Sequence, residues 1–167
     1  LHLLELFTSQ VAKVGMTDGI RQVLQEESDA LRAYYEQAGI LIARPAGGTS
    51  CRLAISAKGG TNAENHNHND VGSYAVALGS ETMVGDQGGP NSYPGDYFNG
   101  DAPQKYKIKG SFGHPVPVVD GRTQSSGGKA KGVVLQKEFT NEKDVFSIDY
   151  TSAYSTPNLD KLIRTFV

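Results

Sequence analysis

Hydrophobic positions recur with two different periods along the chain. In the first forty residues they follow the three- and four-residue spacing of an amphipathic helix, interrupted at "GMTDG". From residue 39 onward they alternate with polar residues, and clusters of Gly, Pro, Asn and Asp separate the short alternating runs. The helical positions are Leu3, Leu4, Phe7, Val11 and Val14, then Ile20, Val23, Leu24, Leu31, Tyr34 and Tyr35. The alternating positions are Ile40 and Ile42, Leu53 and Ile55, Tyr74, Val76 and Leu78, Val133, Leu135 and Phe139, and Phe146, Ile148 and Tyr150.

The alternating runs decide the expected fold class. Short alternating strands with turn signals and no helix between them are typical of an antiparallel sandwich. We therefore expect a mainly β fold, with a short helical segment over residues 1–38 and a two-sheet antiparallel β-sandwich over residues 39–167. The length of 167 residues suits one domain with one sizeable core. The first residue is Leu1, and the closing run "IRTFV" reads as an unfinished strand, so we expect a longer protein and a sandwich truncated at its C-terminus.

Charge and composition narrow the class of protein. The formal net charge of −2 and the isoelectric point near 6.1 argue against nucleic acid as a partner. A single cysteine, Cys51, excludes an internal disulfide. No apolar run approaches the length of a membrane span, so none is expected. The 20 glycines favour turn-rich β structure over a helical bundle.

The candidate chemistry lies in "NHNHNDVGSY", residues 65–74. If this stretch is extended, His66 and His68 share one face, because successive side chains of a strand point to opposite sides. A metal site needs a further ligand. Asp86 closes the strand predicted at "ETMVGD", and His114 begins the strand predicted at "HPVPVVD". Both positions suit strand ends that meet at one rim of a sandwich. Two histidines, an aspartate and an open position suit zinc. The spacing alone equally allows surface loop residues that never converge.

A longer block around the histidines resembles the heparinase II/III-like family of polysaccharide lyases. The resemblance rests on "KGGTNAENHNHNDVGSYAVALG", followed by "DQGG" and "GHPVPVVDG", and it extends from about residue 39 to the C-terminus. In that family an (α/α) toroid domain precedes an antiparallel β-sandwich, and the substrate cleft lies between the two. The resemblance implies that residues 1–38 are a remnant of, or linker from, a toroid domain of the same full-length protein. It also implies a periplasmic or secreted bacterial protein.

The resemblance further implies a role for individual residues. The metal, usually zinc, would be held by His68, Asp86 and His114. His66 and Tyr93 would be catalytic, with His66 facing the substrate cleft. The implied substrate-binding residues are Asn65, Asn67, Lys105 and Tyr106. Asn65, Asn67 and Asn69 would satisfy backbone groups and brace the imidazoles.

The chain departs from the family pattern at two places. The Arg-Tyr pair of the family reads "KY" at Lys105 and Tyr106. The "HN" of the family at its third metal ligand reads "HP" here, and Pro115 removes a side-chain partner while leaving the histidine. Neither departure touches the implied metal ligands.

The reaction implied by the resemblance is β-elimination across a uronic acid, which makes an acidic polysaccharide of heparan or alginate type the expected partner. The enzyme must neutralise the carboxylate, remove the adjacent ring proton and protonate the leaving oxygen. In the family the principal tyrosine, an asparagine and a histidine of this machinery come from the toroid. We therefore expect this chain to be inactive alone. A non-catalytic carbohydrate-binding sandwich is the alternative; a cupin-type metalloenzyme fits less well, because no glutamate follows His68 before Glu81.

Several charged and aromatic residues near the motif have simpler interpretations. Asp70 and Glu64, which flank the histidines, are expected in solvent or capping roles, and Tyr97 is expected to pack its loop. Lys105, Lys107 and Lys109 would share one side of a possible strand. Such a row attracts a polyanion, but it more often marks a charged edge that discourages strand pairing.

Overall fold

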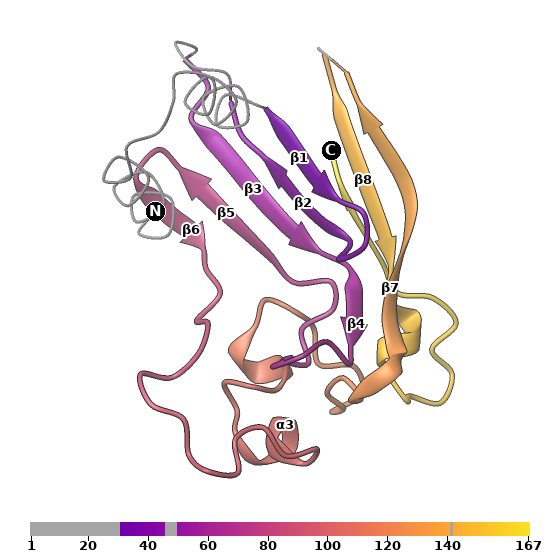
Figure 1. Ribbon diagram of the computed structural model, residues 1–167. Helices are drawn as coiled ribbons and strands as arrows, with labels where there is room; N and C mark the ends of the chain where they lie inside the picture. Colours follow the sequence, from indigo (N-terminus) through magenta and orange to yellow (C-terminus); the bar gives the residue numbers. More distant parts are fainter. Residues whose placement is uncertain (1–30, 46–49, 141) are drawn as a thin grey trace.

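The computed structural model describes residues 31–45, 50–140 and 142–167 and shows two antiparallel sheets (Figure 1). One sheet has five strands in the order β1-β2-β3-β5-β6, and the other has four in the order β4-β7-β8-β9. Among the described residues, helix is confined to the short α3 (Ala102–Lys105) and two 3-10 turns, Ser111–Gly113 and Thr151–Ala153. Neither α3 nor the turns are long and apolar enough to cross a membrane. This is the mainly β, two-sheet antiparallel architecture that the sequence predicts.

The strands are short, as the alternating runs require. The five-stranded sheet contains β1 (Arg32–Tyr35), β2 (Ile40–Ala43), β3 (Leu53–Lys58), β5 (Tyr74–Leu78) and β6 (Glu81–Val84). The four-stranded sheet contains β4 (Gly60–Asn62), β7 (Gly127–Phe139), β8 (Asp144–Asp149) and β9 (Ile163–Phe166). Strand β7 is the longest, and its register with β8 shifts between Val134 and Gln136.

The predicted helical segment is wrong at its C-terminal end. Residues 32–35 form β1, which pairs antiparallel with β2 so that Tyr34 lies opposite Leu41. The Tyr34 ring packs edge-on against Phe146 of the other sheet, with 5.7 Å between ring centroids. This tertiary contact and the β pairing outweigh a helical spacing of few positions, because strand formation depends on the neighbours that a side chain packs against. The remainder of the predicted helix, residues 1–30, lies outside the described residues.

The core forms where the inner faces of the two sheets meet. Phe146 and Ile148 of β8 are fully buried against Leu41 and Ala57 of the five-stranded sheet. Burying a side chain of this size stabilises the fold by about 1.5–3 kcal/mol. Further core members are Val71, Ala130, Tyr150, Ala153 and Tyr154. Val71 belongs to the segment that follows the paired histidines, so the core itself anchors one end of the candidate site.

The candidate site residues gather at one end of the two sheets because the chain crosses between the sheets there (Figure 1). Strand β3 ends at Lys58 in one sheet, and β4 begins at Gly60 in the other. Gly60 has a φ of +68°, and a Cβ there would lie 2.7 Å from the Ala38 carbonyl oxygen, so the crossing requires glycine. Residues 63–73 then return to β5, and residues 85–126 leave β6 at the same end.

The predicted strand at "HPVPVVD" is wrong. His114 follows the 3-10 turn Ser111–Gly113, and the following stretch contains only an isolated bridge between Val119 and Arg122. The two prolines, Pro115 and Pro117, lack the N–H groups that a ladder of hydrogen bonds needs. His114 is therefore placed by a loop and not by a strand end.

Candidate metal centre and adjoining pocket

The histidine-bearing segment, residues 63–73, is held by one buried glutamine. Gln124 is 2% exposed, and its Oε1 accepts hydrogen bonds from the Val71 N–H (3.0 Å) and the Asn62 side chain (2.9 Å). Its Nε2 donates to the Val71 carbonyl oxygen at 2.7 Å. One side chain thereby satisfies both backbone groups of Val71, as a neighbouring strand would. Gln124 fixes the end of the segment nearest the core.

Asn69 provides the second attachment of this segment. Its backbone N–H donates to the Lys109 carbonyl oxygen at 2.9 Å, and its Nδ2 donates to the Gln124 carbonyl oxygen at 3.0 Å. Asn67 donates to the carbonyl oxygen of His68. The expectation that asparagines satisfy backbone groups holds for these two residues. No asparagine of the motif hydrogen-bonds an imidazole within the described ranges.

Replacing Gln124 by alanine is expected to destabilise the protein by at least about 3 kcal/mol, because several buried polar groups lose their partner at about 1–3 kcal/mol each. For a domain of this size that corresponds to a fall in melting temperature of roughly 6–12 °C. Thermal denaturation followed by circular dichroism measures the change. Gln136→Ala, at an exposed position of β7, is the matched control and should change the melting temperature by less than about 2 °C. Equal melting temperatures for both variants would contradict the bracing role.

His68, His114 and Asp86 form a continuous chain of polar contacts. His68 Nδ1 lies 3.1 Å from His114 Nε2, and His114 Nδ1 lies 2.6 Å from Asp86 Oδ2. The hydroxyl of Tyr97 lies 3.2 Å from the other nitrogen of His68. Tyr97 is 1% exposed, so its hydroxyl holds the His68 ring from the buried side. The three residues that the resemblance assigns to the metal therefore lie together.

His66 does not share a face with His68, so the extended segment predicted for the motif is wrong. Asn65 and His66 lie in a turn, and His66 has a φ of +59°. A positive φ rotates the backbone, so the two histidines diverge. The His66 ring stacks on Phe98 with 4.5 Å between centroids, whereas His68 turns toward His114.

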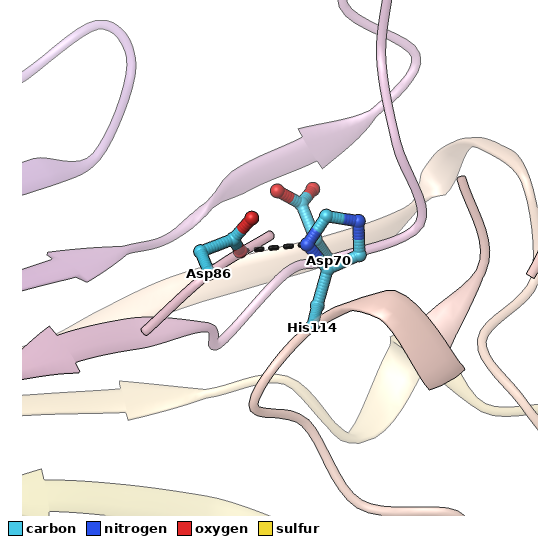
Figure 2. A group of neighbouring side chains, drawn as sticks. All are labelled: Asp70, Asp86 and His114. Carbon is cyan, nitrogen blue, oxygen red and sulfur yellow. Dashed lines mark hydrogen bonds and ion pairs between the residues drawn. The ribbon is translucent and has the colours of Figure 1, made fainter. Parts of the chain in front are cut away.

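A second acidic residue joins Asp86 and His114. One ligand atom from each of Asp70, Asp86 and His114 lies within 4.8 Å of the other two (Figure 2). Asp70 is buried and forms an ion pair with Lys58, so the predicted solvent or capping role for Asp70 is wrong. Two carboxylates and an imidazole are ligands that divalent cations accept. These three residues fit a metal ion, although the Lys58 ammonium competes with a cation for Asp70.

The protonation states of the group also suit a cation. Burial lowers the pKa of His68, and the neighbouring His114 lowers it further. Burial alone would raise the pKa of Asp86, but the hydrogen bonds that it accepts from His114 and from the Gly88 N–H hold the pKa below its usual value. A neutral imidazole and an ionised carboxylate near pH 7 are the forms that bind metal.

A polar pocket of about 380 Å³ adjoins this group. His66, Asn65 and Asn67 line it from the motif, and Phe98 and Lys109 line it from the long connection after β6. Its further lining residues are Asn62, Glu64, Asn69, Asn99, Gly100, Pro103, Ser126 and Gly127. The structure thus brings three of the predicted catalytic or substrate-binding residues, Asn65, His66 and Asn67, to one pocket.

The other predicted substrate residues lie outside this lining. Lys105 forms an ion pair with Asp96, and the Tyr106 hydroxyl donates to the same carboxylate. Tyr93 is 56% exposed and contacts the rings of Tyr97 and Phe98, with centroid distances of 5.0 Å and 5.2 Å. Tyr93 therefore belongs to an aromatic cluster with Tyr97 and Phe98, of which Phe98 lines the pocket.

Sequence reasoning missed the residues that support the site. Tyr97 does pack its loop, as expected. Its hydroxyl also contacts His68 and helps to orient that ring, a role for which the sequence carries no signal. Gln124 lies in a stretch rich in Ser, Thr and Gly, where a buried amide has no periodic signal. For Asp70 a signal existed: a carboxylate two residues after His68 is a metal-ligand candidate by its proximity alone.

The fold and the site define a mainly β domain of two antiparallel sheets that carries a group fitted to a divalent cation and an adjoining polar pocket. No protein-family model matches the chain, and no curated protein matches its sequence. The resemblance described above therefore remains a prediction that rests on the quoted motifs.

Proposed function

We propose that this chain is the metal-containing β-sandwich domain of a polysaccharide lyase that cleaves uronic-acid-containing polysaccharides by β-elimination. One observation carries the proposal: the two histidines of the motif serve two adjacent places. His68 contacts His114, which contacts Asp86, whereas His66 lines the polar pocket beside Phe98. A metal site next to an open pocket with a titratable imidazole suits a reaction that moves protons on a bound sugar.

Zinc is the proposed metal, with Asp86 and His114 as two ligands. The third is His68, as the resemblance implies, or Asp70, which lies within ligand distance of the other two. Zinc bound here would organise the loops around the pocket and add positive charge near an acidic substrate. Asp86 contacts His114 at Nδ1, whereas His68 contacts it at Nε2, on the opposite edge of the ring. This arrangement supports Asp70 as the third ligand, although Asp70 also pairs with Lys58.

His66 is the proposed proton-transfer or carboxylate-binding residue of this half of the cleft. An imidazole donates or accepts a proton near neutral pH, and this ring is exposed to the pocket. Asn65 and Asn67 would bind sugar hydroxyls or the uronate carboxylate from the same lining. The base that removes the ring proton would come from a toroid domain.

A non-catalytic carbohydrate-binding module is the second candidate. The observation that favours it is a set of exposed rings beside the pocket, Tyr93 at 56% and Phe98 at 47% exposure. Aromatic faces of this kind stack on sugar rings without any chemistry. Neither candidate needs a nucleic-acid partner.

A reconstitution experiment separates the two candidates. The chain is mixed with a separately expressed toroid domain of the family it resembles, and unsaturated uronate is followed by its ultraviolet absorbance on heparan-type and alginate-type polymers. Elimination that needs both components supports the lyase. Binding of the polymer without elimination, in the mixture and in the full-length protein, would reject the lyase and support the carbohydrate-binding module.

A further inference from the structure

A buried lysine lines the pocket beside His66. Lys109 is 4% exposed, although lysine is among the residue types least often fully buried. Its Nζ donates one hydrogen bond, to the Tyr97 carbonyl oxygen at 2.7 Å, and lies 4.9 Å from the ring centroids of Tyr97 and Phe98. An ammonium has three donors. Two of them have no acceptor in the part of the chain that the structure describes.

No carboxylate of the described residues pairs with Lys109. Glu64 also lines the pocket, but it is exposed and accepts a hydrogen bond from the Thr61 hydroxyl at 2.8 Å. Burial lowers the pKa of Lys109. Lys58 and Lys105 differ from it, since each forms an ion pair with an aspartate.

The energetic balance of Lys109 is therefore incomplete. Removing an ammonium from water is costly when no opposite charge compensates it. Contacts with two aromatic rings and one hydrogen bond to a carbonyl oxygen supply no such charge. An anion in the pocket would supply the missing counter-charge and accept the two remaining N–H groups. The predicted edge strand at residues 105–109 does not form, so strand protection does not explain this lysine.

We propose that Lys109 binds the anionic substituent, a carboxylate or a sulfate ester, of a sugar held in the pocket lined by His66 and Asn67. The sugar as ligand rests on the proposed function; the anion site rests on the burial and the unfilled donors of Lys109. Asn65 and Asn99 line the same pocket and offer amides to hydroxyl groups. Lys109 is thus a residue that selects acidic sugars over neutral ones.

The competing explanation is that Lys109 only ties down its loop through the Tyr97 carbonyl oxygen. Bracing the loop needs a hydrogen-bond donor but no charge, whereas binding an anion needs the charge. Substitutions of Lys109 therefore distinguish the two explanations. Lys109→Gln removes the charge and keeps a donor, whereas Lys109→Met removes both. Lys107→Met, at an exposed neighbouring position, is the matched control.

The test is a titration of the isotope-labelled chain with sodium glucuronate, sodium sulfate and glucose, followed by the backbone amide signals of residues 65–69 and 98–100. Wild-type protein and Lys107→Met should bind glucuronate or sulfate at least tenfold more tightly than glucose. Lys109→Gln and Lys109→Met should each weaken binding of the anion at least tenfold. Binding of glucuronate alone identifies a carboxylate, and binding of sulfate identifies a sulfate ester.

Two results would overturn the proposal. One is equal affinity of the wild-type protein for glucuronate, sulfate and glucose, which needs no variant to fold. The other is unchanged anion affinity in Lys109→Gln. A lyase assay on the full-length protein is read separately: lost anion binding in the variants without any elimination in the wild type keeps the anion site and rejects the lyase. Elimination that persists unchanged in Lys109→Gln, with unchanged anion affinity, rejects the anion site and keeps the lyase.

Discussion

His114→Ala is expected to abolish stoichiometric zinc binding and to lower the melting temperature of the zinc-loaded protein by roughly 8–16 °C. The side chain of His114 is 2% exposed and contacts both Asp86 and His68, so its removal breaks either candidate ligand set. A ligand present at about a thousand times its dissociation constant stabilises the folded state by about 4 kcal/mol, and each kcal/mol shifts the melting temperature of such a domain by about 2–4 °C. Elemental analysis and thermal denaturation of the same preparation measure both effects.

The third ligand is identified by comparing His68→Ala with Asp70→Ala. The variant that loses zinc while the other keeps it marks the ligand. Asp70→Ala also breaks the ion pair with Lys58, so its stability is measured with and without chelator to separate the two causes. Asp160→Ala, at an exposed position, is the control and should keep both zinc and stability. Wild-type protein that is purified without chelator, holds no zinc and gains no stability from added zinc would remove the metal assignment.

His66→Ala is expected to reduce elimination by the full-length protein by about 10²–10⁴-fold, the usual contribution of a proton-transferring side chain. Zinc content and melting temperature should change little, because the ring is exposed and stacks on Phe98. Turnover and bound zinc are measured on one preparation. Loss of zinc would make His66 a ligand, and retention of both zinc and turnover would make it a packing residue.

The backbone at His66 requires a second substitution beside alanine. Its φ of +59° is strained for alanine but common for asparagine, whose short polar side chain tolerates the left-handed region. His66→Asn therefore keeps the turn and removes the imidazole. Turnover lost in both variants points to the ring; turnover lost in alanine alone points to the backbone.

The alternating hydrophobic pattern predicted five of the nine strands in the described residues. Strands β2, β3, β5, β7 and β8 coincide with such runs. Strand β4, Gly60–Asn62, has no apolar alternation, and only its pairing with β7 defines it. Strand β1 was missed because Leu31, Tyr34 and Tyr35 also fit a helical spacing, whereas the contact of Tyr34 with Phe146 depends on the other sheet.

The convergence of the candidate metal ligands was implied by the resemblance, whereas spacing alone left it open. His68, Asp86 and His114 do lie together, but a loop and not a strand end places His114. The buried amide of Gln124 and the carboxylate of Asp70 depend on partners more than ten residues away in the chain. Such partners leave no period in the sequence, so only the folded structure shows the hydrogen bonds of Gln124 and the ion pair of Asp70.

The crossing at Gly60 ties the motif to the relative position of the two sheets. Residues 63–73 follow β4 in one sheet and precede β5 in the other, so the segment connects the two sheets. If one sheet rotates or slides against the other, the distance between the two ends of this segment changes. The positions of His66 and His68 therefore depend on how the two sheets pack, and Phe146 and Ile148 lie in the core between the sheets. Core substitutions far from the histidines should therefore alter metal affinity and pocket shape together.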